Sequence, residues 1–411
     1  MRVHLDYGRS GMPVELPDSA VRHHLGIAAE PPLADPAAAV RDALAAPIGT
    51  ASLAALASGK SDACIVLCDI TRPVPNAVIL GEMLPVLVAA GIPFERITLL
   101  IATGTHRPNV GDELVEMLGE SVANSGVRIV NHDCEDPETH RVVGLGPGGI
   151  PADLDTRWLD ASLRITVGLI EPHFMAGYSG GRKLIMPGVA ALAAIQAWHS
   201  PRFLEHPLAT NGVLDGNPVH AENLAIARLA PADLICDVTI DAERRVTGVF
   251  AGHMERAWEV GVEFVARQVR PAIPEPVDIV VTCGGGHPLD ASFYQVVKGL
   301  VTASAICKPG GTIVAAARMA EGIGSAHFRG LLERTEDLDG LVERMSAADW
   351  IPVPEQWQVE MLAKAARGRR LVLVTEGASP DEVRRCHLES AQTVETAVEA
   401  ALARSGVGAT L

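Results

Sequence analysis

Short apolar runs recur along the chain, and each ends in a polar or glycine-rich cluster that is followed by a helical pattern of hydrophobic residues. A continuous apolar run of this length is typical of a strand that is buried on both faces. The alternation of such strands with helices predicts βαβ units and parallel sheets. The predicted strands are residues 63–67, 97–101, 165–170, 277–282, 312–317 and 371–375.

The length of the chain and one proline-rich segment predict its domain organisation. A chain of 411 residues exceeds what a single hydrophobic core usually supports. Residues 269–277 contain prolines that disfavour both helix continuation and sheet pairing, which indicates a linker. We therefore expect two α/β domains with mainly parallel sheets, at residues 1–272 and 273–411, with the active site in the cleft between them.

Composition and charge narrow the function classes. Hydrophobic residues make up 48% and charged residues 20%, as in ordinary globular proteins. A formal net charge of −16 without a basic run argues against nucleic-acid binding, so an anionic substrate would need local Arg and Lys residues. No apolar signal core or membrane-length run is present, and the cysteines form no CxxC pair. We expect a cytoplasmic protein with reduced thiols that does not bind membranes.

Two histidines, His106 and His173, follow predicted strands. The carboxyl ends of parallel strands meet at one edge of a sheet, so both imidazoles are expected to converge there with Asp69 and Arg72. A single histidine at a strand end is more often structural than catalytic, and convergence favours proton transfer. The strand-end loops therefore predict an active site.

Two glycine-rich segments resemble nucleotide-binding motifs. Residues 144–149 (GLGPGG) fit G-x-G-x-x-G on paper, but a proline interrupts the motif and no helix follows, so we interpret them as a turn. Residues 177–183 (GYSGGRK) have glycines that let backbone amides approach a phosphate, together with two cations. This segment is either an anion-binding loop or a tight turn.

Two predicted helices carry further candidates. The helix predicted for residues 189–198 ends at His199, whose alternative role is a favourable cap at the negative end of the helix dipole. If the segment after Pro288 is helical, Tyr294, Gln295 and Lys298 share one face. The alternative for these three residues is an exposed polar face.

Taken together, these motifs resemble the lactate racemase family that uses a nickel pincer nucleotide. Their order and rough spacing agree with that family over nearly the whole chain, and as a set they are specific. They are DITRP (69–73), GTHRP (104–108), EPH (171–173), GYSGGRKLIMPG (177–188), His199 and YQVVKG (294–299).

The resemblance implies a cofactor and the residues that hold it. The cofactor would be pyridinium-3,5-bisthiocarboxylic acid mononucleotide with bound nickel, attached covalently to Lys183 and ligated through its metal by His199. Sulfur and carbon donors from the nucleotide and one imidazole suit square-planar nickel(II). We expect protein made in a host without the cofactor-biosynthesis proteins to lack it. The expected nucleotide-binding residues are Asp69, Thr71, Ser179, Gly180 and Gly181.

The resemblance also implies racemisation or epimerisation of a small anionic 2-hydroxy acid by hydride transfer. His106 and His173 would exchange the hydroxyl proton on opposite faces, with Lys298 as a further catalytic group, while Arg72 would bind the substrate carboxylate. For Trp357 a structural role stays equally open. The expected substrate-binding residues are Arg72, Tyr294, Gln295, Lys298 and Trp357.

Alternative functions remain at this point. A relative could racemise a larger or dicarboxylic 2-hydroxy acid or epimerise a sugar acid, because side-chain selection depends on pocket shape. An NAD-dependent dehydrogenase lacks support because a sound dinucleotide fingerprint is missing. In a non-catalytic nucleotide-binding module the two histidines would not face each other. Assembly as a homo-oligomer is also open.

Overall fold

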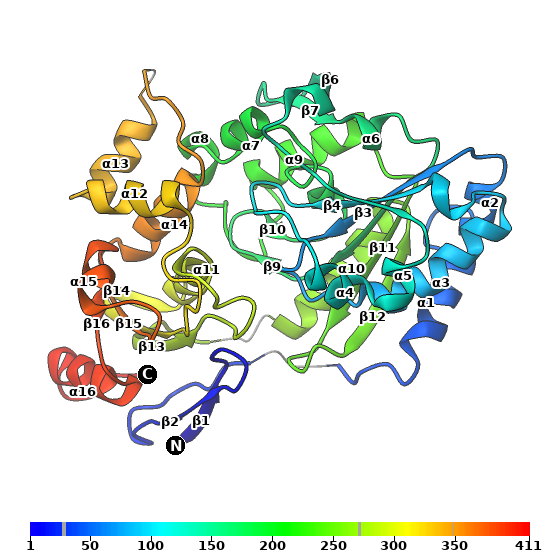
Figure 1. Cartoon of the computed structure of the whole chain (residues 1–411). Coiled ribbons are helices and arrows are strands. Elements are labelled where there is room, and N and C mark those ends of the chain that lie inside the picture. Colours follow the sequence, from blue (N-terminus) through cyan, green and yellow to red (C-terminus); the bar gives the residue numbers. More distant parts are fainter. Residues whose placement is uncertain (27–29, 270–272, 348) are drawn as a thin grey trace. The chain divides into compact units, whose positions relative to one another are not determined.

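The computed structural model describes residues 1–26, 30–269, 273–347 and 349–411, and this part of the chain divides into two compact units (Figure 1). The larger unit comprises Gly26–His199 and His206–Arg270, and the smaller comprises Met1–Leu25, Ser200–Glu205 and Pro271–Leu411. The fold is mixed α/β with parallel sheets, as the apolar runs predict. The linker predicted at residues 269–277 lies partly outside the described residues.

The larger unit is built on a sheet with the strand order β12–β11–β8–β3–β4–β5. Neighbouring strands from β11 to β5 pair in parallel, whereas β12 is antiparallel to β11. The apolar run of β3 is buried almost throughout, as expected for a strand in the middle of a covered sheet. The strands are β3 (Ala63–Cys68), β4 (Ile97–Ala102), β5 (Arg128–Asn131), β8 (Arg164–Leu169), β11 (Leu234–Ile240) and β12 (Val246–Gly252).

Helices and two hairpins surround this sheet. The hairpin of β6 (His140–Leu145) and β7 (Pro151–Asp155) turns at residues 146–149, which confirms that the GLGPGG segment is a turn. A second, short hairpin pairs β9 (Pro172–His173) with β10 (Gly177–Tyr178). The helices are α1 (Pro36–Ala45), α2 (Leu53–Ala57), α3 (Asn76–Ala89), α4 (Asp112–Leu118), α5 (Glu120–Ala123), α6 (Thr156–Leu159), α7 (Leu192–Trp198), α9 (Pro218–Leu229) and α10 (Arg256–Val269).

The smaller unit has its own parallel sheet in the order β13–β14–β15–β16. Its core includes Ile279, Val314 and Val372 from three of these strands. The strands are β13 (Val277–Cys283), β14 (Cys307–Ala316), β15 (Arg370–Val374) and β16 (Glu389–Ser390). The helices are α8 (Pro201–Leu204), α11 (Phe293–Ser304), α12 (Ala326–Arg334), α13 (Leu338–Met345), α14 (Gln356–Ala366), α15 (Pro380–Arg385) and α16 (Val394–Ser405).

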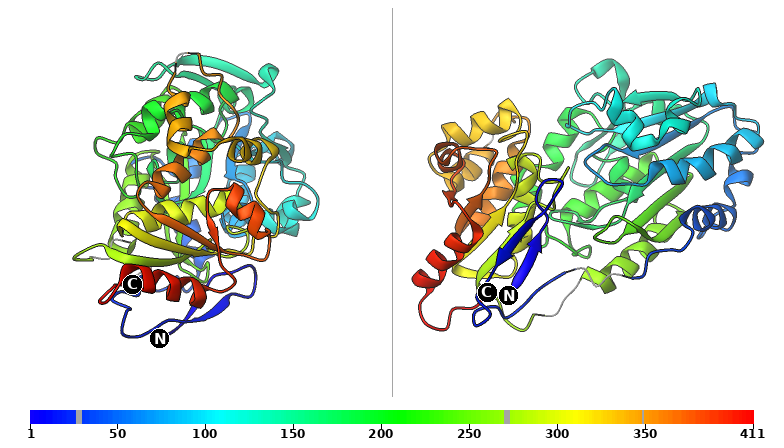
Figure 2. Two further views of the ribbon diagram at one scale, coloured as in Figure 1. Left: turned by 90° about the vertical axis from the view of Figure 1, so that its left-hand side faces the viewer. Right: turned by 60° about the horizontal axis from the view of Figure 1, so that its bottom comes forward.

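The N-terminal residues correct one expectation about the domains. The antiparallel hairpin of β1 (Arg2–Leu5) and β2 (Met12–Glu15) belongs to the smaller unit, beside whose sheet it is drawn in Figure 2. Tyr7 and Val14 are buried in the same core as the sheet strands. Residues 1–25 therefore do not belong to the N-terminal domain expected at residues 1–272, because their apolar side chains are buried against the smaller unit.

Within the part of the chain that the structure describes, no helix is both long and apolar enough to cross a membrane. The cytoplasmic location stays a prediction.

Candidate active site

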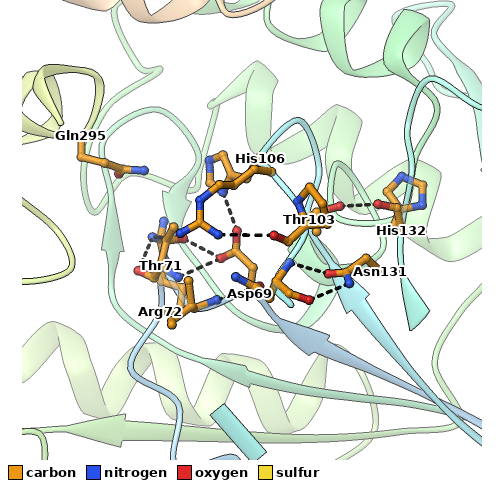
Figure 3. Close-up of polar contacts among 12 residues, drawn as sticks. Asp69, Thr71, Arg72, Thr103, His106, Asn131, His132 and Gln295 are labelled. Carbon is orange, nitrogen blue, oxygen red and sulfur yellow. Dashed lines mark hydrogen bonds and ion pairs between the residues drawn. The ribbon is translucent and has the colours of Figure 1, made fainter. Parts of the chain in front are cut away.

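Loops after three adjacent strands of the larger unit carry the polar residues that the sequence analysis selected. The order β8–β3–β4 is parallel, so the carboxyl ends of these strands lie side by side. Asp69 directly follows β3, His106 follows β4 by four residues, and Glu171 lies two residues beyond β8. Figure 3 shows Asp69, Thr71, Arg72 and His106 pointing toward one another at this edge. Asp69, Arg72 and His106 therefore converge as predicted, whereas the convergence of His173 with them stays a prediction.

Asp69 and His106 form a carboxylate–imidazole pair with 2.6 Å between Oδ2 and Nδ1. The hydroxyl of Thr71 donates to the other carboxylate oxygen at 2.6 Å, and the backbone N–H of Thr71 donates to the same oxygen at 3.2 Å. Burial by itself would raise the pKa of Asp69, but His106, Thr71 and the charge of Arg72 hold that pKa below its usual value. The carboxylate is therefore charged. It orients His106, and the nucleotide contact that the resemblance implies for it stays a prediction.

The guanidinium of Arg72, expected to bind the substrate carboxylate, pairs with Glu171 at 3.0 Å from Nε to Oε1. Its Nη1 atom also donates to the backbone carbonyl of Thr71 at 3.1 Å. Glu171 belongs to the EPH motif, yet the sequence analysis gave it no role. Its position directly after a buried strand was the signal that could have identified it.

His173 lies on β9, and the short hairpin determines its hydrogen bonds. The backbone N–H groups of Ala176 and Met175 donate to Nδ1 of His173 at 3.2 and 3.4 Å. Gly177 allows the return of the chain, because its φ is +77° and a side chain there would collide with the carbonyl oxygen of Val213. His173 is thus a buried residue whose ring is held by its own hairpin.

The glycine-rich segment is a buried turn. The N–H of Ser179 donates to the carbonyl of Glu171 at 2.9 Å, and the hydroxyl of Ser179 donates to the carbonyl of Leu169 at 2.6 Å. The N–H of Gly181 donates to Oδ2 of Asp237 at 2.7 Å. These groups hold the turn together, which favours the tight-turn interpretation. The nucleotide contacts that the resemblance implies for Ser179, Gly180 and Gly181 stay predictions.

Two buried ionisable residues, Arg182 and Asp237, lie next to this turn. Arg182 stacks on Trp258 with 3.9 Å from Cζ to the ring centroid and donates through Nε to Nδ1 of His220 at 2.9 Å. Burial lowers the pKa of Arg182 to about 9 and raises that of Asp237 to about 7. No motif pointed to Asp237, Trp258 or His220, although a carboxylate within the apolar run of β11 is a visible signal.

Lys183 and His199, the predicted cofactor attachments, both lie close to Trp198. The Lys183 amine is 4.9 Å from the centroid of the Trp198 ring, and the ring centroids of Trp198 and His199 are 4.4 Å apart. His199 caps the end of α7 and shares a hydrogen bond at 2.9 Å between Nδ1 and the carbonyl of Ile195. Burial, and then the charge of Lys183, lower the pKa of His199 to about 3. Its imidazole is therefore neutral, which a metal ligand requires.

The remaining predicted residues lie in the smaller unit. Lys298 donates through Nζ to Oε1 of Gln295 on α11, as expected for helical residues three apart. The indole of Trp357 on α14 donates to the hydroxyl of Tyr294 at 3.0 Å. Tyr294 and Gln295 are buried and Lys298 is partly buried, so these three residues do not form an exposed polar face.

Among the described residues, no group of three or more His, Cys, Asp or Glu side chains could hold a metal ion. His132 is buried, with its Nδ1 3.1 Å from Asp155 and its Nε2 3.0 Å from the carbonyl oxygen of Ala190.

Comparison with known proteins gives a consistent result. The N-terminal domain model of lactate racemase matches residues 7–212, and the C-terminal domain model matches residues 273–411. The lactate racemase of Thermoanaerobacterium thermosaccharolyticum is 33% identical over 97% of this chain and 94% of its own length. That of Lactiplantibacillus plantarum is 37% identical over 90% of this chain and 87% of its own length.

Solved structures agree with the sequence relatives. The lactate racemase apoprotein of Thermoanaerobacterium thermosaccharolyticum matches with a TM-score of 0.91 at 32% identity, over 100% of this chain and 97% of the other. A protein from Thermotoga maritima shares the fold, with a TM-score of 0.70 at 16% identity over 90% of this chain and 93% of the other. The chain belongs to the lactate racemase family.

Proposed function

We propose that this protein interconverts the enantiomers of lactate or of a related short 2-hydroxy acid. Membership of the lactate racemase family supports this reaction. The observation that carries the proposal is the Asp69–His106 pair, with 2.6 Å between Oδ2 and Nδ1, close to the charge of Arg72. An imidazole oriented by a carboxylate is a suitable general base for a hydroxyl group, and a guanidinium binds a carboxylate with good geometry.

A base alone is not sufficient for this reaction. The Cα–H bond next to a carboxylate is very weakly acidic, so its removal as a proton at neutral pH faces a high barrier. We therefore propose the nickel pincer nucleotide as cofactor, which when bound would supply a pyridinium carbon that accepts and returns a hydride. Lys183 would hold it through a thioamide bond, and His199 would ligate its nickel.

The chemistry of these two residues fits the cofactor. Nδ1 of His199 faces the carbonyl of Ile195, which can only accept a hydrogen bond, so Nδ1 carries the proton and Nε2 carries the lone pair. One neutral imidazole nitrogen is the kind of donor that would hold a nickel ion whose other donors come from the nucleotide. The amine of Lys183 lies against the same indole ring as His199.

The chain's own residues would bind the substrate and move its proton. Arg72 would bind the carboxylate, with Glu171 holding the guanidinium in place at 3.0 Å. Nε2 of His106 would accept the hydroxyl proton, and the resulting positive charge would face Asp69. His173 would exchange the proton on the opposite face.

The residues of the smaller unit keep the roles that the resemblance implies. Tyr294, Gln295, Lys298 and Trp357 stay predicted substrate contacts, and an active site between the two units stays a prediction.

The experiment is expression with and without the enzymes that make the cofactor. We expect added mass on the peptide that contains Lys183, bound nickel, and conversion of either lactate enantiomer to the racemate, all restricted to co-expressed protein. Chiral chromatography measures conversion, and larger, dicarboxylic and sugar-derived 2-hydroxy acids are assayed in parallel.

Lys183→Arg is the matched control, because it keeps the positive charge but cannot form a thioamide. It should fold and show neither added mass nor conversion. Co-expressed protein that carries the mass and nickel but racemises no 2-hydroxy acid would contradict the proposal.

A further inference from the structure

The hydrogen bonds around His106 fix the position of its proton. Nδ1 lies 2.6 Å from Oδ2 of Asp69. The pKa of Asp69 is lowered despite burial, so this carboxylate is ionised and can only accept a hydrogen bond. In the neutral imidazole the proton is therefore on Nδ1, and Nε2 carries the lone pair.

The hydrogen bonds around His173 fix the opposite arrangement. The backbone N–H groups of Ala176 and Met175 point at Nδ1 from 3.2 and 3.4 Å. A backbone N–H can only donate, so Nδ1 of His173 carries a lone pair and the proton of the neutral ring is on Nε2.

Side chains outside the hairpin hold the peptide groups that face His173. Nδ2 of Asn217 donates to the carbonyl oxygen of Met175 at 2.9 Å, which fixes the same peptide plane whose N–H group belongs to Ala176. Nη2 of Arg182 donates to the next carbonyl, that of Ala176, at 3.1 Å. Asn217 is fully buried and also caps the start of α9.

We infer that the two histidines are held in opposite tautomers, with Asp69 placing the proton of His106 on Nδ1 and Asn217, through the Met175–Ala176 peptide, placing that of His173 on Nε2. Asp69 and Asn217 are positioning residues for proton transfer. His106 rests as a proton acceptor toward the substrate and His173 as a hydrogen-bond donor.

The tautomers make the two faces of the site chemically unequal, a consequence that rests on the proposed function. When the hydroxyl O–H bond breaks, its proton goes to Nε2 of His106, the electron pair stays on the substrate oxygen, and the new imidazolium charge faces a carboxylate. A proton added at Nδ1 of His173 would instead oppose two N–H donors. His173 can accept a proton at Nε2 only after its own proton moves to Nδ1 and the hairpin amides turn away.

The test is nitrogen-15 NMR of the full chain with labelled imidazole rings at about pH 8, where an ordinary imidazole is neutral. Signals are assigned with His106→Asn and His173→Asn. We expect His106 to show a protonated Nδ1 and His173 a protonated Nε2. Asp69→Leu should remove the Nδ1–H signal of His106 and leave the His173 signals in place.

Asn217→Ser is the decisive variant for the second histidine, because serine keeps the cap of α9 but loses the donor to Met175. We expect the His173 signals to shift toward a tautomer mixture while those of His106 stay unchanged. Asp35→Ser, which alters the cap of α1 in the same unit, is the matched control and should change neither histidine.

Two results would overturn the inference: the same tautomer at both histidines, or His173 signals that do not respond to Asn217→Ser. Failure of the loaded enzyme to racemise any 2-hydroxy acid would instead refute the proposed function and leave the NMR result standing.

Discussion

Asp69 in the larger unit and Glu360 in the smaller are both buried carboxyl groups, with 5% and 0% of their surface exposed, yet their protonation differs. Hydrogen bonds from His106 and Thr71 keep the pKa of Asp69 low. Burial, and then the adjacent carboxylate of Glu205, raise the pKa of Glu360 to about 9. Asp69 is thus ionised at neutral pH, whereas Glu360 is protonated.

The cations near Glu360 do not reverse this outcome because other groups engage them. Arg367 pairs with Glu205 at 2.7 Å and with Asp339 at 2.6 Å, and Lys364 donates to the carbonyl of Leu204 at 3.0 Å. Burial makes charge unfavourable at both sites, and the orientation of neighbouring donors decides whether the carboxyl group loses its proton. A buried carboxyl group can therefore be considered for catalysis only after the groups that donate hydrogen bonds to it have been identified.

The largest effect is expected at Asp155, a third buried carboxylate that resembles Asp69. It lies 2.5 Å from Nη2 of Arg157 and 3.1 Å from Nδ1 of His132. Asp155→Ala removes the acceptor of the buried His132 and of the partly buried Arg157, and it should lower the free energy of unfolding by about 3–5 kcal/mol, measured by urea denaturation. Asp160→Ala, at an exposed ion pair with Arg141, is the control and should change it by less than about 1 kcal/mol.

The pH dependence of the Asp155 effect has a definite sign. Burial alone would raise its pKa, but His132 and Arg157 lower it to about 2, below the value in the unfolded chain. The stabilisation is therefore complete above the unfolded pKa of about 4 and is lost as pH falls toward 2. If the difference in unfolding free energy between wild type and Asp155→Ala does not become smaller as the pH falls toward 2, this explanation is contradicted.

Removing one hydrogen-bond donor from Asp69 should raise the pKa of this carboxyl group and so bring it closer to the raised pKa of Glu360. Thr71→Val deletes the hydroxyl that donates to Oδ1 at 2.6 Å. We expect a higher pKa for Asp69, a shift of the acid limb of the pH–rate profile to higher pH, and a loss of about tenfold in kcat/KM, which corresponds to about 1.4 kcal/mol. Thr103→Val removes a comparable buried hydrogen bond, to the carbonyl of His132, and should not shift the profile.

Glu360→Gln should show an effect of opposite sign, seen as a change in how stability depends on pH. Between the unfolded pKa of about 4.3 and the folded pKa of about 9, the folded state keeps a proton that the unfolded state has lost, so stability falls as pH rises, by at most about 1.4 kcal/mol per pH unit. Glutamine has no proton to lose, so the variant should gain stability over wild type at about pH 8 relative to about pH 5. Thermal unfolding at the two pH values measures this, and an equal shift at both would count against a protonated Glu360.

The smallest effect is expected for a carboxylate that is only partly buried. Glu82 pairs with Arg41 at 2.8 Å, with 22% and 57% of the two side chains exposed. Glu82→Gln should change the free energy of unfolding by no more than about 1 kcal/mol, because solvent screens the pair and the ordered side chains lose entropy. A larger loss of unfolding free energy in urea denaturation would mean that the ion-pair partner contributes more to stability than the burial of the carboxylate does.

The sequence was informative where a pattern is local. The apolar runs predicted β3, β4 and β8, and the shared direction of parallel strands predicted that Asp69 and His106 would meet. Helical spacing likewise predicted the contact between Gln295 and Lys298. These inferences rest on short-range periodicity and on a general property of parallel sheets.

Contacts between distant segments could not be predicted in this way. Asn217 reaches Met175 across 42 positions, and Asp237 reaches Gly181 across 56, and neither pair leaves a periodic pattern. The amides of the glycine-rich turn could serve an anion or an internal acceptor, and the sequence does not distinguish these until the position of Asp237 is known. In both cases a hydrogen bond between segments that are far apart in the sequence determines the local structure, and no local pattern predicts such a bond.

The hairpin of β1 and β2 has a consequence for synthesis of the protein. The core that buries Tyr7 and Val14 is completed by Val394 and Leu411, and the N–H group of Leu411 bonds to the carbonyl of Ala20 at 2.9 Å. Residues 1–25 therefore find these partners only after the segment that contains Val394 and Leu411 has been synthesised. The strands of the larger unit lie between these two segments in the sequence. The larger unit can therefore fold before the hairpin of β1 and β2 has its partners.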